Sequence, residues 1–343
     1  MPAFNSQVKQ ILILSLLLAL IILVIREIYI FLPGLLGALT LYILSRGSYF
    51  QLIYHRKWRR GWAAGFMLLF YSVIIGLLIY LAITLLAPKV QLFLQDPQAM
   101  INTANEALAE VQKKSGIVLI SRQSIADFLN NLSVWLPRLI NSTANLITNI
   151  AVMLFILYYM LVHGKEMEKY LDHIIPLKHS NVITLATETK KLVRASALGI
   201  PFISLIQGLT ATLGYYIFDV GDYVLWGFLT GLFAFFPVIG TMIIWVPLVV
   251  YMYADHQAAH ATGLLFYSLI VTGNVDYLAR ITILKKWGNV HPVVTVIGVI
   301  AGLSLFGFIG FIFGPLLVNY IILLFKIYQN EFIHNHNSKA GPG

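Results

Sequence analysis

Long apolar segments separated by short polar gaps dominate this 343-residue chain. Hydrophobic residues make up 59% of the sequence and charged residues 11%, whereas a soluble domain carries about 25% charged residues. Such segments belong in lipid, where an α-helix pairs its backbone groups within one segment. The sequence therefore predicts an all-α, polytopic integral membrane protein, with apolar segments near residues 11–25, 28–45, 62–87, 143–162, 199–218, 222–236, 240–254, 259–279, 290–306 and 310–328.

The stretch Gly227–Gly240 is apolar, but it contains Pro237 and ends on Gly240. Proline has no amide hydrogen and clashes with the preceding turn, and glycine restrains the backbone little, so we expect the helix to break here and free carbonyl groups. At membrane depth, an open backbone is tolerated only where it packs in protein or lines a water-filled cavity. The break is therefore a candidate transport site in an interrupted or re-entrant helix.

A second break is expected at Gly307, Gly310 and Pro315 in the last apolar pair. Two Gly/Pro-interrupted segments in one chain point to a transport site, because their helix ends offer partial charges to a solute or an ion. Glycines four residues apart also recur, and we interpret them as close helix packing, with hinge or pore lining as the alternative. These pairs are Gly61/Gly65, Gly227/Gly231, Gly298/Gly302 and Gly310/Gly314.

Basic residues produce the formal net charge of +9, and most of them lie in gaps that alternate along the chain. The main groups fall within 46–60, 165–194, 280–286 and 326–339. Because loops rich in Lys and Arg stay in the cytoplasm, these gaps and both termini are predicted to be cytoplasmic. We interpret the charge as a signal for topology and for contact with lipid headgroups, not as a nucleic-acid site.

Motifs for common chemistries are missing from the sequence. There is no cysteine, and the chain contains no P-loop, dinucleotide fingerprint, HExxH or GxSxG motif. The commonest signatures of an ATP-driven pump or a membrane hydrolase are therefore absent. We expect secondary or passive transport, with no enzymatic activity, no cofactor and no metal.

Residues 88–142 are more polar than their surroundings but keep apolar residues at helical spacing. Ser124 and Asp127 resemble a capping box, and the apolar residues that follow share one helical face. We predict an amphipathic helical extracytoplasmic insert that packs on itself, on the membrane surface or on a neighbouring subunit; ligand sensing is the alternative. The predicted organisation is 1–87, N-terminal membrane helices; 88–142, the insert; 143–198, a membrane helix and a cytoplasmic helix; 199–328, the core with broken helices; and 329–343, a disordered polar tail.

The first two apolar segments are predicted to form a hairpin. Arg26 and Glu27 would mark its tip, and Pro33–Gly34 the start of the returning arm. No small-residue cleavage site follows the first segment, so we expect it to remain in the mature protein.

Polar residues inside apolar segments are the remaining candidates for a site. Asp276 lies four residues before Arg280, close enough to pair on a helix, and Asn274 is nearby. Ionisable groups at membrane depth are costly and mark function by default, so Asp276 and Asn274 are candidates for contact with a cation, a proton or a substrate. The alternative is that Asp276 and Arg280 anchor a cytoplasmic helix end. Gln207 is a further candidate, unless it only bonds a neighbouring helix.

Several motifs in the C-terminal half resemble those of the AI-2E (autoinducer-2 exporter) family of bacterial membrane proteins, also called PerM-like. They are Phe236–Gly240, Asn274–Asp276, Val290–Val294, Phe306–Gly310 and Gly314–Pro315. The order of segments also resembles the family arrangement over almost the whole chain. One departure is that residues 277–286 lack the proline that the family usually has shortly after the Asn and Asp.

The resemblance implies transport, because family members are described as exporters of a small furanone signal and others as sodium/proton antiporters. We therefore expect a secondary transporter or facilitator that exports a small polar metabolite or signal across the bacterial inner membrane. The alternatives are a cation/proton antiporter that uses Asp276 and a non-transporting membrane scaffold. A homo-oligomer is expected because the insert and the glycine faces need burial.

Overall fold

Helix is the regular secondary structure throughout the described part of the computed structural model, which covers residues 6–95, 127, 143–236, 239–288, 292–306 and 310–329. The all-α prediction is therefore confirmed for these residues. Almost the whole predicted insert and the polar tail lie outside the described residues, as do Pro237 and Gly307.

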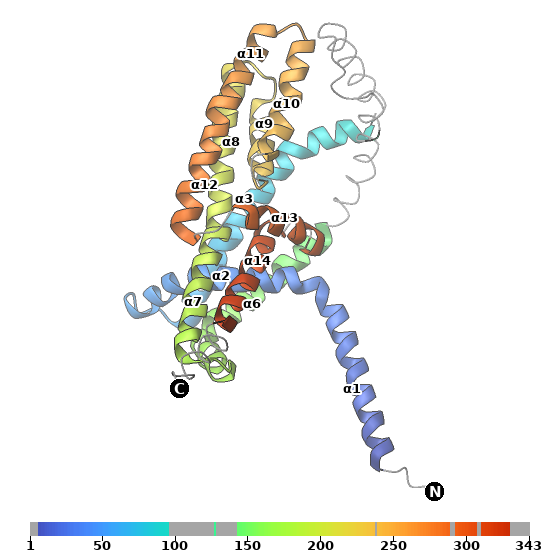
Figure 1. The fold of residues 1–343 in the computed structure, drawn as a ribbon, viewed down its shortest axis with the longest axis vertical. Helices are drawn as coiled ribbons and strands as arrows, with labels where there is room; N and C mark the ends of the chain where they lie inside the picture. Colours follow the sequence, from blue (N-terminus) through green and yellow to red (C-terminus); the bar gives the residue numbers. More distant parts are fainter. Residues whose placement is uncertain are drawn as a thin grey trace, which may run out of the picture.

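The described residues of the N-terminal half form four long helices and one short turn (Figure 1). They are α1 (Ser6–Ile28), the 3-10 turn η1 (Tyr29–Phe31), α2 (Leu32–Tyr54), α3 (Arg60–Gln95) and α6 (Thr143–Ile174). Helix α3 continues through Pro88, so the start of the predicted insert is the end of this helix. The helices α2, α3 and α6 pack through a buried cluster that includes Tyr42, Tyr49, Leu157 and Leu161.

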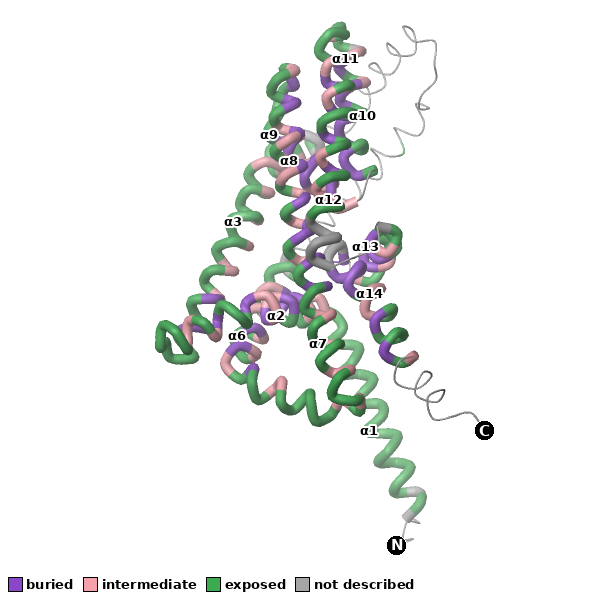
Figure 2. The backbone as a smooth tube through the Cα atoms, turned by 60° about the vertical axis from the view of Figure 1, so that its left-hand side comes forward, coloured by how far each residue is buried: buried purple, intermediate pink, exposed green. Residues whose placement is uncertain are grey.

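The predicted hairpin of the first two segments is wrong. Helix α1 passes through η1 directly into α2, and Figure 1 shows that the chain bends there and that α1 projects away from the other helices. Pro33 lies in the first turn of α2, where a helix needs no amide donor, so it is compatible with a bend. Every α1 residue whose side chain is described is exposed (Figure 2), as expected of an apolar helix surrounded by lipid.

Two long continuous helices organise the C-terminal half, and each contains a π-helical segment. The first joins α7 (His179–Arg194), η2 (Ala195–Gly199) and α8 (Ile200–Ile217), and the second joins α11 (Ala258–Tyr267), η3 (Ser268–Thr272) and α12 (Gly273–Gly288). A π-helix contains one extra residue per turn and often marks a functional position. Here α8 packs on both η3 and α12.

Two pairs of shorter helices complete the described part of the C-terminal half. The first pair is α9 (Tyr223–Phe233) with α10 (Ile239–Ala254), and the second is α13 (Pro292–Phe306) with α14 (Gly310–Tyr328). At 1.5 Å per residue, the 11 residues of α9 extend only about 16 Å, about half of a ~30 Å hydrocarbon core. Four helices among the described residues are long and apolar enough to cross a membrane, and α9, α10, α13 and α14 belong to shorter apolar segments. The prediction of interrupted helices is confirmed.

Glycines form the closest helix contacts, as the spacing predicted. A Cβ atom added to Gly231 would lie 2.8 Å from the carbonyl oxygen of Ser204, and α8 and α9 approach each other there. In the last pair, a Cβ on Gly302 or Gly314 would overlap the backbone of the facing helix. Gly65, in contrast, has no neighbour within 4 Å, so its pair does not mediate close packing within one chain.

Candidate functional site

The first break lies between α9 and α10. Helix α9 ends at Phe233, a turn covers 234–236, and α10 begins at Ile239. Gly240 is buried, and a Cβ at this position would overlap the carbonyl oxygen of Phe233. A side chain here would push the start of α10 away from the end of α9, so glycine permits the two helices to meet at a tight turn.

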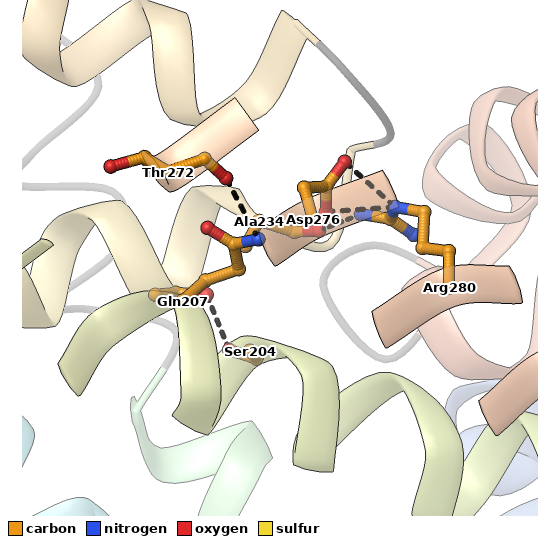
Figure 3. Close-up of polar contacts among 7 residues, drawn as sticks. Ser204, Gln207, Ala234, Thr272, Asp276 and Arg280 are labelled. Carbon is orange, nitrogen blue, oxygen red and sulfur yellow. Dashed lines mark hydrogen bonds and ion pairs between the residues drawn. The ribbon is translucent and has the colours of Figure 1, made fainter. Parts of the chain in front are cut away.

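Arg280 of α12 binds the helix end that the break exposes. Its guanidinium Nη2 donates to the carbonyl oxygen of Ala234, 46 residues away in the sequence. This carbonyl belongs to the C-terminal end of α9, where the helix dipole is negative and a cation is stabilising. In Figure 3 dashed lines join the guanidinium both to this helix end and to the carboxylate of Asp276. The carbonyl group that the break frees is thus bound by a charged side chain from another helix.

Asp276 holds Arg280 in place through a buried ion pair. Arg280 Nε lies 2.9 Å from Oδ1 and 3.1 Å from Oδ2 of Asp276. The side chains of Asp276 and Arg280 are only 9% and 12% exposed. Helix is continuous from Ala258 to Gly288, so the pair lies well inside it, and the alternative of an anchor at a helix end does not describe its position. A pair this buried is costly to form and very costly to break.

Gln207 reaches from α8 to the π-helix η3. Its Nε2 donates to the carbonyl oxygen of Thr272 at 3.4 Å, while its Oε1 has no hydrogen-bond partner within residues 6–95, 127, 143–236, 239–288, 292–306 and 310–329. The residue is completely buried. It therefore bonds a neighbouring helix, as the alternative interpretation stated, but only with half of its amide.

Asn274 is close to Asp276 in sequence but has a different role in the structure. It is exposed, and its Nδ2 donates to the carbonyl oxygen of Ile270 in η3. Two side-chain amides thus bond carbonyl groups of the same π-helix, Asn274 from within the helix and Gln207 from α8.

Sequence reasoning missed several contributors to this region. Ser204 donates its hydroxyl to the carbonyl oxygen of Gly231, and Thr272 supplies the carbonyl that Gln207 binds. Thr230 is completely buried and pairs with Tyr215, with 2.8 Å between the two hydroxyl oxygens. In the sequence, Ser204, Thr230 and Thr272 are each only a Ser or Thr inside an apolar helix. Such residues are common, and the sequence does not reveal which group they bind.

The second break lies between α13 and α14, and two of its predicted residues are described. Gly310 packs against Gly302, and Pro315 is buried in α14 against Gly298. Their observed role is close packing of the two helices. Helix α14 packs on the π-helix η2, and η2 packs on α12, so the two broken pairs are connected through η2.

A side chain from the N-terminal half caps the second break. The hydroxyl of Tyr29 in η1 donates to the carbonyl oxygen of Leu305, in the last turn of α13, at 3.0 Å. The bend that carries Tyr29 is itself held by the buried Asn149 of α6. Asn149 accepts from the amide of Gly34 at 3.1 Å and donates to the carbonyl oxygen of Ile30 at 3.0 Å. Both broken helix pairs are therefore bound at a C-terminal helix end by a donor from elsewhere in the fold.

Comparison with known proteins agrees with this architecture. A family model described as "AI-2E family transporter" matches residues 11–330. A protein of Aquifex aeolicus is 26% identical over 187 residues, which cover 54% of this chain and 53% of that protein. A Helicobacter pylori protein is 25% identical over 224 residues, or 63% of each chain, and one of Methanothermobacter thermautotrophicus is 24% identical over 190 residues, or 55% and 57%. All three are named as candidate transport proteins, and this chain spans between half and two thirds of their lengths.

Proposed function

Since the chain belongs to the AI-2E transporter family, we propose that it is a secondary transporter or facilitator that exports a small polar metabolite or signal across the bacterial inner membrane. The proposed pathway runs along the two broken helix pairs. It includes Gln207, Pro237, Gly240, Asn274, Asp276 and Arg280 at the first break and Gly307, Gly310 and Pro315 at the second.

The observation that carries this proposal is the bond between Arg280 and Ala234. A helix end inside an apolar core is tolerated only when its carbonyl groups are paired or wet. Here the end of α9 is paired by a guanidinium that is itself neutralised by Asp276. Such an arrangement stabilises a broken helix at depth, and broken helices of this kind supply the solute and ion sites of many secondary transporters.

The first experiment compares the metabolites that cells release with and without this protein. A compound enriched outside the expressing cells is then tested for flux in proteoliposomes that contain the purified protein. Arg280→Gln should reduce the flux strongly, because the shorter Gln side chain carries no charge to neutralise Asp276 and to stabilise the end of α9. Arg46→Gln is the matched control, since Arg46 pairs with Glu168 in an exposed ion pair between α2 and α6. Equal flux from both variants would remove Arg280 from the pathway.

The second candidate is a cation/proton antiporter, and the buried carboxylate of Asp276 favours it. In proteoliposomes, an imposed sodium or proton gradient should then drive exchange, and Asp276→Asn should abolish it. Asp222→Asn is the control because Asp222 is an exposed carboxylate that pairs with Lys89. Exchange that survives in Asp276→Asn would contradict the antiporter mechanism. A scaffold would show no flux and would co-purify with a partner at a fixed ratio.

We further propose that both termini are cytoplasmic. Two ion pairs support this orientation. Arg46 and Glu168 belong to segments predicted to be cytoplasmic, and they bind each other. Lys89 and Asp222 belong to segments predicted to be extracytoplasmic, and they also bind each other. Because the chain has no cysteine, single cysteines at His55 and at Asp219 can be labelled with an impermeant maleimide in intact spheroplasts. Labelling of the His55 position from outside would contradict the proposed orientation. Cross-linking of the same membranes tests the expected homo-oligomer.

A further inference from the structure

The acceptor oxygen of Gln207 receives no hydrogen bond from the part of the chain that the structure describes. The carbonyl of Thr272 can only accept a hydrogen bond, so the amide nitrogen of Gln207 must face it and the amide oxygen must point elsewhere. In Figure 3 the dashed line from Thr272 ends at the amide nitrogen of Gln207, and no dashed line reaches the amide oxygen. It has no hydrogen-bond partner among the described residues, although Gln207 is completely buried. Buried polar atoms in native proteins are almost always paired, so an orphan acceptor indicates a donor that the described residues do not supply.

The π-helix that Gln207 binds carries buried hydroxyl side chains. The π-helix η3 contains the buried residues Ser268 and Thr272 and packs directly on α8. π-helical segments concentrate at functional sites because their irregular hydrogen bonding presents backbone groups to a ligand. Two side-chain amides already bind carbonyls of η3, from Gln207 and Asn274. Gln207 and η3 thus form a small polar island within apolar helices.

The charges near this island are already balanced. Asp276, in the first turn of α12, is neutralised by Arg280. The other Asp, Glu, Lys, Arg and His residues of the described part between 200 and 280 lie in the turn at 218–222 and at the start of α11, in 255–260. Within this described stretch, a cation at Gln207 would find no unpaired carboxylate beside it, and burying an uncompensated charge is costly.

We propose that Gln207 Oε1 and the π-helix η3 form a buried subsite that accepts a hydrogen bond from the O–H group of an uncharged ligand. The donor is a hydroxyl of the transported solute or a resident water molecule, which share this chemistry. If the donor is a solute, the inference rests on the proposed transport function. It then names the transported solute as an uncharged, hydroxyl-bearing compound.

The test measures thermal unfolding of the purified chain in detergent by tryptophan fluorescence, with xylitol as an uncharged probe. Gln207→Leu removes the orphan acceptor and keeps a side chain of similar size. Thr230→Val is the matched control, because Thr230 is equally buried but its hydroxyl is already paired with Tyr215 and the backbone of Trp226. Xylitol also stabilises proteins in general by exclusion from their surface, and that effect is common to all three proteins.

For a solute hydroxyl, wild type and Thr230→Val should show the same saturable rise in Tm with xylitol. Gln207→Leu should need about tenfold more xylitol for half of that rise, the factor expected for one lost hydrogen bond. For resident water, the three proteins should respond equally to xylitol. A high-resolution structure of the wild type should then show a water within hydrogen-bond distance of Gln207 Oε1.

Two results would overturn the proposal. One is an equal response to xylitol together with no water at Oε1. The other is a rise in Tm with sodium chloride but not with choline chloride that disappears in Gln207→Leu, because the ligand would then be a cation. These measurements do not depend on transport activity. An absence of solute flux would therefore contradict the proposed function but would not test the subsite at Gln207.

Discussion

Removal of the Asp276 carboxylate should destabilise this protein more than removal of any exposed carboxylate. In Asp276→Asn, the guanidinium of Arg280 loses a partner that lies 2.9 and 3.1 Å from its Nε. The Arg280 side chain is only 12% exposed, so water cannot solvate the guanidinium once its counter-ion is removed. Breaking a buried ion pair by removing one partner costs about 3–5 kcal/mol. We expect a loss of about 3 kcal/mol in the free energy of unfolding, because the Asn oxygen can still accept one hydrogen bond.

The assay is reversible unfolding in mixed micelles, followed by tryptophan fluorescence. Asp222→Asn is the control because its carboxylate also binds a cation, Lys89, but is 54% exposed. An exposed pair is worth about 0–1 kcal/mol. If both variants lose the same free energy, the interaction of Asp276 with Arg280 is screened like a surface pair, and the reasoning from burial is refuted.

A double variant separates charge from packing. Asp276→Leu combined with Arg280→Met removes both charges and keeps apolar volume. Replacing a whole buried pair by apolar residues is often neutral, so the double variant should lose less free energy than the sum of the two single variants by at least about 1 kcal/mol. Additive losses would mean that the two side chains stabilise the fold independently.

The remaining predictions concern the two breaks. Gly240→Ala should lower the free energy of unfolding by more than about 2 kcal/mol, because its Cβ would overlap the carbonyl oxygen of Phe233. Gly65→Ala, where no atom lies within 4 Å, should stabilise the helix by about 0.5–1 kcal/mol; a similar loss in both variants would contradict the close approach at Gly240. Tyr29→Phe removes only the hydroxyl that binds the end of α13 and should broaden the distances between spin labels on α6 and α13. The exposed Tyr80, changed to Phe, should leave them unchanged, and unchanged distances in Tyr29→Phe would argue against the cap.

Local sequence signals predicted much of the helical order. Apolar length and the absence of charge identified the segments, and the break after Phe233 lies where the Gly/Pro pattern predicted it. Glycines spaced by four residues predicted the close contacts of α13 with α14, because only a missing side chain lets two backbones approach so closely. These signals work because they depend on residues within one or two turns of each other.

Other features depend on partners that are remote in the chain. The predicted N-terminal hairpin is wrong because Arg26 and Glu27 do not reverse the helix, and the bend at η1 is instead held by Asn149 of α6. The cap of α13 by Tyr29 joins residues that are 276 positions apart. A polar residue in an apolar helix signals that some partner exists, but it carries no information on which helix provides it.

The sequence by itself determined the membrane class, the helical segments, the positions of the breaks and the short list of buried polar residues. These follow from hydropathy, from the missing amide of proline and from the cost of polar groups in lipid. Only the tertiary structure decided that Asp276 and Arg280 bind the end of α9, that Asn274 bonds its own helix, and that Gln207 keeps one unpaired oxygen. The physical reason is that hydrogen bonds and ion pairs depend on distances within about 3 Å, and the packing of separate helices sets those distances.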